Sequence, residues 1–98
     1  MVFLVGAIDI HDPDEYAKYR DGVYEALAPF NVEVLSVDGQ PEVLEGRQPG
    51  GHQFIIKFES SEAVHSFYNS ANYRKIIDHR HRASETRFLM VMKSVDQD

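Results

Sequence analysis

The chain has 98 residues, a formal net charge of −6 and no cysteine. This length suits one domain with its own hydrophobic core, so we expect a single domain over residues 1–98. The lack of cysteine excludes disulfides, thiolate nucleophiles and cysteine-ligated zinc. It is also compatible with a reducing cytoplasm, where we expect the protein to reside. No run of eighteen apolar residues occurs, so we expect no membrane span.

The charge is unevenly distributed along the chain. Residues 1–45 carry two Lys or Arg against ten Asp or Glu, whereas residues 46–98 carry eight against six. A phosphate backbone would meet a strongly acidic surface on the first half, so we expect no nucleic-acid partner. A local anion site in the second half remains open.

The first third of the chain predicts a strand followed by a helix. Residues 2–11 (VFLVGAIDIH) are apolar and rich in β-branched side chains, as in a strand. Asp12 then suits the N-cap of a helix, and Pro13 suits its first position. Glu15 suits the second half of a capping box, in which its side chain bonds to the backbone N–H of the N-cap residue. The helix should run from Pro13 to about residue 28, where a proline ends it. Its inner face carries residues at helical spacing: Tyr16, Tyr19, Val23, Leu27 and Phe30.

The middle of the chain predicts two strands with a loop between them. Residues 32–38 (VEVLSVD) resemble a strand, which residues 43–46 continue weakly. Residues 47–51 (RQPGG) predict a loop because of their proline and glycines. Residues 52–59 (HQFIIKFE) alternate between faces and predict a third strand.

Two short helices and a last strand should follow. Ser60 or Ser61 suits the N-cap of a helix over residues 62–69, and Ser70 that of a helix over residues 71–82. Residues 86–95 predict the fourth strand. The resulting order, β-α-β-β-α-β, is typical of the ferredoxin-like α+β sandwich, an antiparallel sheet with its helices on one face.

Both faces of this predicted sheet carry apolar side chains, although a monomer with helices on one face should be mostly polar on the other. On the third strand we expect His52, Phe54, Ile56 and Phe58 to share the helix side. A second copy of the sheet is the simplest cover for the other face, so we predict a homodimer. The residues expected to need that cover are Phe3, Val5, Ala7, Ile55, Leu89 and Val91.

Several segments together resemble a known bacterial family of about one hundred residues and no assigned function, within the dimeric α+β barrel superfamily. They are DPDEYAKY (12–19), EVLEG (42–46), FESSEA (58–63) and FYNSANY (67–73), the last followed by Arg80. The resemblance spans nearly the whole chain and implies the dimeric barrel fold. The wider superfamily includes cofactor-independent monooxygenases, isomerases, haem-handling enzymes and ligand sensors, so the resemblance implies no single chemistry.

The stretch DHRHRASE (78–85) concentrates charged and titratable side chains at the end of a predicted helix. At about 100° per residue, Arg80 falls near the centre of the apolar face that Tyr73 and Ile76 define. An inward guanidinium needs an acceptor. That acceptor is either an internal group of the protein or the anionic group of a ligand in the cleft between helices and sheet.

Four other residues are candidates for the same cleft. Tyr16 and Tyr19 lie on the inner side of the first predicted helix, where they either fill the core or orient a ligand. His52 heads an apolar strand face after a loop and is a candidate general base. Arg47 adjoins that loop and could close over an anion, although such residues are more often solvated.

We expect no metal site and no cofactor. His79 and His81 diverge by roughly 200° on a helix, so they cannot chelate one ion together. Asp9 and His11 resemble a D-x-H metal pair, but the sequence offers no evident third ligand. Haem handling would require an axial histidine in the cleft.

Two functions remain open from the sequence. In the first, the protein binds or transforms a small anionic or aromatic organic molecule in the helix–sheet cleft, by proton transfer or oxygenation without a cofactor. Arg80 would then hold the anion, His52 act as base, and Tyr16 or Tyr19 position the ligand. In the second, it is a non-catalytic module whose oligomer is its purpose, and its polar residues serve structure. Whether the protein is an enzyme is left undecided.

Overall fold

The computed structural model of the chain describes residues 1–48 and 50–96. Its helices and strands follow the predicted order. The strands are β1 (Val2–Ile10), β2 (Glu33–Asp38), β3 (His52–Phe58) and β4 (Ser84–Lys93). The helices are α1 (Pro13–Leu27), a 3-10 turn η1 (Ala28–Phe30), α2 (Ser61–Tyr68) and α3 (Ala71–Ala83).

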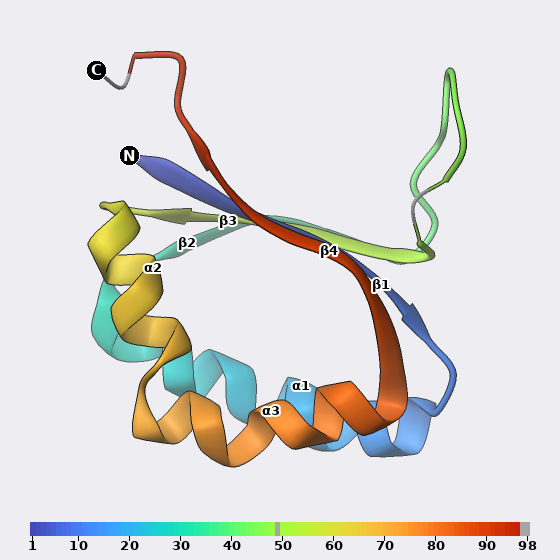
Figure 1. The fold of residues 1–98 in the computed structure, drawn as a ribbon, viewed down its shortest axis with the longest axis horizontal. Coiled ribbons are helices and arrows are strands. Elements are labelled where there is room, and N and C mark those ends of the chain that lie inside the picture. The colour runs from blue at the N-terminus through green and yellow to red at the C-terminus, as the bar shows by residue number, and fades with distance from the viewer. Residues whose placement is uncertain (49, 97–98) are drawn as a thin grey trace.

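Within this described part, the strands form one four-stranded antiparallel sheet in the order β2-β3-β1-β4. Figure 1 shows α1, α2 and α3 together on one side of the sheet. This arrangement is the ferredoxin-like α+β fold, as the sequence predicts. Among these helices, none is long and apolar enough to cross a lipid bilayer.

The helix boundaries follow from local capping. The Asp12 carboxylate accepts a hydrogen bond from the backbone N–H of Glu15 at 3.1 Å, as expected of an N-cap. The second half of the predicted capping box is wrong, because the Glu15 side chain reaches α3 instead of the Asp12 backbone. Ser60, and not Ser61, caps α2, while Ser70 caps α3. These two separate caps explain why α2 and α3 are two helices and not one.

Apolar residues of the helices and of the covered sheet face form one core, with aromatic rings at its centre. Phe67 lies 4.5 Å from Tyr73 and 5.7 Å from Phe58 between ring centroids. Gly22 lets α1 approach α3 closely, since a Cβ there would lie 2.8 Å from Ile76. Of the residues predicted for the inner face of α1, Tyr19 and Leu27 are in the core and the others pack against it: Tyr16, Val23 and Phe30.

The sheet face opposite the helices is apolar, but the residues of β4 that lie on it differ from the prediction. Directly paired residues of antiparallel strands point to the same face. Leu89 pairs with the buried Gly6 and Val91 with the buried Leu4, so both belong to the helix side. We name the uncovered surface the bare face. Its apolar residues by register are Phe3, Val5, Ala7, Ile55, Phe88, Met90 and Met92, of which Ala7 is fully buried in the single chain.

The predicted assignment of Leu89 and Val91 to the uncovered face would place the alternate residues Met90 and Met92 in the core, and this is wrong, since they are 44% and 51% exposed. The error has a physical cause. In a strand with apolar residues on both faces, alternation does not show which of the two sets of alternate residues faces the helices. Strand pairing decides the question, because Val5 lies opposite Met90 and Phe3 opposite Met92.

The segment between β2 and β3 projects from the sheet on the side away from the helices (Figure 1). The predicted continuation of β2 over residues 43–46 is wrong, because β2 ends at Asp38 and no strand is assigned there. Leu44 in this segment is 86% exposed. The predicted loop over 47–51 is confirmed for its described residues, and Pro49 lies outside them.

Candidate functional site

A cleft of about 140 Å³ lies between α1 and strands β2 and β3. A cavity of roughly 150 Å³ holds one benzene ring, so this cleft suits a single ring and is too small to enclose a porphyrin. Its wall is mostly aliphatic and aromatic. The lining residues are Tyr16, Tyr19, Arg20, Val23, Tyr24, Leu27, Val34, Val37, His52, Phe54 and Ile56.

Phe54 forms part of the floor of this cleft, and its position depends on a glycine. The Phe54 ring lies over Gly6 of the neighbouring strand, where an added Cβ would come within 2.3 Å of it. A side chain at position 6 would therefore displace the ring. Gly6 thus helps to set the shape of the cleft floor.

Two polar side chains in the cleft, Tyr16 and His52, lie against each other. Their ring centroids are 5.6 Å apart with an edge-on geometry. Within residues 1–48 and 50–96, nothing hydrogen-bonds the Tyr16 hydroxyl or either nitrogen of His52. Polar groups in a largely apolar wall normally bond to the protein, to water or to a ligand. We call Tyr16 and His52 the cleft pair.

Burial sets the protonation of the cleft pair. Desolvation lowers the pKa of His52 below its ordinary 6.5, so its imidazole is neutral at pH 7 and has a nitrogen lone pair. Desolvation also raises the pKa of Tyr16 to about 12, so its hydroxyl keeps its proton. The cleft therefore combines a neutral proton acceptor with a hydroxyl donor.

The structure brings three of the five predicted site residues together. Tyr16, Tyr19 and His52 line the cleft, and the ring centroids of the two tyrosines are 5.5 Å apart. Arg80 is not among the lining residues and lies behind Tyr19, with its Cζ 5.6 Å from the centroid of that ring. Arg47 is exposed in the segment after β2 and does not line the cleft.

Arg80 points inward, as its helical phase predicts, and is only 3% exposed. Its Nη1 donates to the Tyr73 hydroxyl at 2.7 Å, and this hydroxyl lies 2.8 Å from that of Tyr19. Its Nη2 contacts Nε2 of His81 at 3.2 Å. Its buried Nε has no hydrogen-bond partner among the described residues, nor does any carboxylate of that part of the chain form an ion pair with it. Neutral groups thus hold this cation.

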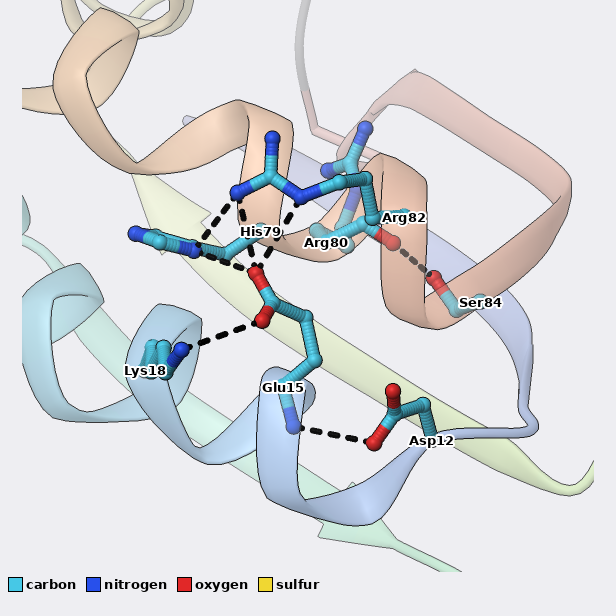
Figure 2. Close-up of polar contacts among 7 residues, drawn as sticks. All are labelled: Asp12, Glu15, Lys18, His79, Arg80, Arg82 and Ser84. Carbon is cyan, nitrogen blue, oxygen red and sulfur yellow. Dashed lines mark hydrogen bonds and ion pairs between the residues drawn. The ribbon is translucent and has the colours of Figure 1, made fainter.

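The neighbouring basic residues of α3 form a different cluster, centred on Glu15 of α1 (Figure 2). The Glu15 carboxylate accepts from Nδ1 of His79 at 2.6 Å, from Nη2 of Arg82 at 3.0 Å and from Nζ of Lys18 at 3.2 Å. These bonds, the one from His79 first, lower the pKa of Glu15 to about 2. We call these four residues the Glu15 cluster. It joins the start of α1 to the end of α3.

The Asp9 carboxylate, considered above as a metal ligand, has other partners. It accepts from Nε of Arg87 at 2.6 Å and from the backbone N–H of Gly51 at 3.0 Å. The hydrogen bond from Arg87 is the main reason that the pKa of Asp9 is lowered. Among residues 1–48 and 50–96 no cluster of three His, Asp or Glu side chains has the geometry of a metal site.

Some residues of the cleft were not expected from the sequence. Val37 and Arg20 line it, although Arg20 is at the rim, with its side chain 62% exposed beside Asp21. Arg20 follows Tyr16 by four positions in α1, a spacing that places both on one side of a helix. The helical spacing could have identified Arg20, whereas Val37 depends on the register between β2 and β3.

Comparison with known proteins gives a family and a fold. Residues 1–94 match the model of the Domain of unknown function (DUF1330). No curated protein matches the chain. The crystal structure of the RPA0582 protein of unknown function from Rhodopseudomonas palustris superimposes with a TM-score of 0.78 at 16% identity, over 97% of this chain and 82% of that one.

Two further solved structures are similar. The methylated RPA0582 protein gives a TM-score of 0.73 at 18% identity, over 97% of this chain and 81% of that one. The crystal structure of HapK from Hahella chejuensis gives 0.65 at 14% identity, over all of this chain and 96% of that one. At such identities the likeness establishes the fold alone.

Proposed function

This chain belongs to the DUF1330 family, whose function is unknown, and we propose that its cleft binds a small aromatic molecule with one polar group. The observation that supports this most directly is the cleft pair. An apolar wall would hold the ring, while the Tyr16 hydroxyl and the His52 imidazole would bind the polar group. The volume of about 140 Å³ limits the ring to roughly the size of benzene.

The cleft pair also supports a chemistry, which is reversible proton transfer without a cofactor. His52, neutral at pH 7, would accept a proton from a C–H bond next to a ligand carbonyl. The electron pair of that bond would move to the carbonyl oxygen, to which Tyr16 would donate a hydrogen bond. Return of the proton from His52 restores the ligand, so the step needs no other reactant.

Binding can be tested by thermal unfolding with benzoate, benzamide, phenol and acetophenone, each at about ten times its dissociation constant or at its solubility limit. A ligand at ten times its dissociation constant stabilises a protein by about 1.4 kcal/mol, which raises Tm by several degrees for a domain of about 100 residues. Tyr16→Phe should weaken binding by roughly tenfold through loss of one hydrogen bond.

Tyr68→Phe is the matched control, because it removes the same atom from a ring outside the cleft. Equal losses in the two variants would contradict the role of the cleft pair. An unchanged Tm with all four compounds would contradict the proposed function itself.

Proton transfer has a separate readout. In D2O, the methyl protons of acetophenone should exchange for deuterium faster with the protein than with buffer, and His52→Gln should abolish the difference. NMR of the acetophenone methyl signal measures this. If acetophenone binds but its methyl protons exchange no faster than in buffer, the protein binds the ligand without catalysing proton transfer, and the catalytic step is rejected.

We also propose that two copies pair through the bare face. Its seven apolar residues are continuous across β3, β1 and β4, and Ile55, Met90 and Met92 are each more than a third exposed in one chain. Exposed apolar patches of this kind mark interfaces in proteins. Residues 39–48 after β2 and residues 94–96 after β4 lie beyond opposite ends of this face, so they would flank a second copy (Figure 1).

Sedimentation equilibrium tests the pairing. The wild-type chain should sediment at twice the mass of one chain, and Val5→Glu should yield monomers, because each interface would then bury two carboxylates. Lys75→Glu, on the exposed side of α3, is the control and should leave the dimer intact. A monomeric wild-type protein would refute the pairing.

The dimer variant also separates the two candidate functions. A folded Val5→Glu monomer that still binds benzoate shows that the cleft works without the interface. A wild-type dimer that binds none of the compounds favours the alternative function, a non-catalytic oligomerisation module. We propose the cytoplasm as the compartment, on the basis of the cysteine-free composition; fractionation of the cells tests this.

A further inference from the structure

Arg80 carries a positive charge in the interior of the fold. Arg80 lies in the last turn of α3, where the helix dipole favours a cation, and the Tyr19 ring lies within cation–π distance. These contacts and the hydroxyl of Tyr73 stabilise the guanidinium but do not neutralise it. Its positive charge therefore extends into its surroundings, since no carboxylate among the described residues pairs with it.

The hydroxyl of Tyr73 is not a counter-anion for Arg80. Burial raises the pKa of Tyr73 far above its ordinary value, so this phenol keeps its proton throughout the physiological range. His81 does not supply a negative charge either, because an imidazole is neutral or positive. The contacts that hold Arg80 in place thus leave its full unit charge.

The cleft lies directly beyond Tyr19. The Arg80 Cζ is 5.6 Å from the centroid of the Tyr19 ring, which is 5.5 Å from that of Tyr16 in the cleft pair. The wall of the cleft contains one cation, Arg20, and none of its described lining residues is an Asp or Glu. The nearby carboxylate of Glu15 is engaged by three basic groups of its own cluster.

We propose that the cleft selects the anionic form of its ligand, an aromatic carboxylate or phenolate, and that Arg80 determines this specificity from behind Tyr19 without contacting the ligand. The inference rests on the proposed function, since it concerns the ligand of the same cleft. At a separation of about 10 Å and an effective dielectric constant of about 20, one unit charge favours a monoanion by roughly tenfold.

This role differs from the anion clamp considered from the sequence. A clamp must touch its anion, whereas Arg80 is buried behind a ring and does not line the cleft. An exposed arginine would be screened by water and salt, but a buried one acts over a longer distance. Burial therefore makes Arg80 unsuited to direct binding but suited to setting the electrostatic potential of the cleft.

The test compares benzoate with benzamide, which has nearly the same shape and no charge. We expect the wild-type protein to bind benzoate at least tenfold more tightly by isothermal titration calorimetry at constant pH. In Arg80→Met, which keeps most of the side-chain volume, this preference should fall by about tenfold while the affinity for benzamide stays the same. Lys75→Met removes an exposed cation from the same helix and should leave both affinities unchanged.

A second measurement needs only the wild-type protein, in case Arg80→Met does not fold. The absorbance of 4-nitrophenol reports its ionisation, and its pKa should fall by about one unit on binding, which corresponds to the tenfold preference. An unchanged or raised pKa of bound 4-nitrophenol overturns the inference, as does an unchanged benzoate preference in folded Arg80→Met. Equal binding of benzoate and benzamide rejects the inference alone, whereas binding of neither rejects the proposed function as well.

Discussion

The basic residues at the end of α3 behave in two opposite ways. In the Glu15 cluster, one carboxylate accepts hydrogen bonds from three basic side chains near the surface (Figure 2). Arg80, between His79 and His81 in the sequence, points into the core and contacts neutral groups. It has no carboxylate partner among the residues described. The paired charges of the Glu15 cluster connect α1 to α3, whereas the unpaired cation of Arg80 produces a positive potential beside the cleft.

Charge alone therefore does not distinguish a structural residue from a ligand-directed one. The relevant property is whether the protein itself satisfies the group. The Glu15 carboxylate has its hydrogen-bond partners within the fold, and the Tyr16 and His52 side chains have none within the part described. Groups of the second kind are the ones that a ligand can complete.

The largest effect should come from Tyr73→Phe, which removes the hydroxyl that accepts from Arg80 and lies against Tyr19. A buried cation that loses its acceptor is strongly destabilising, so we expect the free energy of unfolding to fall by about 3 kcal/mol. Urea denaturation followed by circular dichroism measures it, with Tyr68→Phe as the control. A loss below about 0.5 kcal/mol would show that Arg80 does not depend on this hydroxyl.

Arg80→Met should have a smaller effect on stability, although it changes the more conspicuous residue. It removes the cation together with its need for an acceptor, and replacement of a buried charge by an apolar side chain of similar size is often neutral. We expect a change within about 1 kcal/mol in the same urea experiment. A loss larger than that of Tyr73→Phe would mean that the cation stabilises the fold, and it would contradict our reading of Arg80.

The Glu15 cluster should respond to acid. Its carboxyl has a pKa lowered from 4.5 to about 2, so its stabilisation is complete above the pKa of the unfolded chain and is lost as pH falls from about 4.5 towards 2. Glu15→Gln should therefore be less stable than the wild type at pH 6, and the two Tm values should converge by pH 2. A constant difference in Tm between pH 6 and pH 2 would contradict the assignment.

The smallest effect concerns His52, whose pKa should lie below 6.5 in the free protein because of desolvation. Benzoate bound beside the imidazole should raise this pKa, since an anion favours the protonated form. Titration of the His52 ring signals by NMR, with and without benzoate, measures both values. A pKa that benzoate leaves unchanged would place the ligand away from the cleft pair.

The sequence was sufficient for the fold and for the direction of Arg80, because both depend on local patterns. The helical spacing of Arg80 predicted that its side chain points inward. The N-caps at Ser60 and Ser70 predicted two helices, α2 and α3, in place of one. These features depend on residues within a few positions of one another. The burial of Arg80 could therefore be predicted before its neighbours were known.

Features that depend on tertiary structure were harder to predict. The sequence identified Tyr16 and His52 as candidates, but their contact depends on how α1 lies across the sheet. The link between Glu15 and His79 was missed, since 64 positions separate the two residues. The faces of β4 were assigned wrongly because both sets of its residues are apolar, and only the pairing with β1 distinguishes them.

The most direct test of the central claim, that the cleft with its pair of polar side chains is a binding site, is an NMR titration of the wild-type protein with benzoate. The methyl signals of Leu27, Val34 and Val37, which line the cleft, should shift and saturate together with the ring signals of His52. The methyl signals of Val64 and Ile77, in the core away from the cleft, should stay in place. Shifts confined to other parts of the molecule, or no saturable shift at the cleft, would contradict the claim.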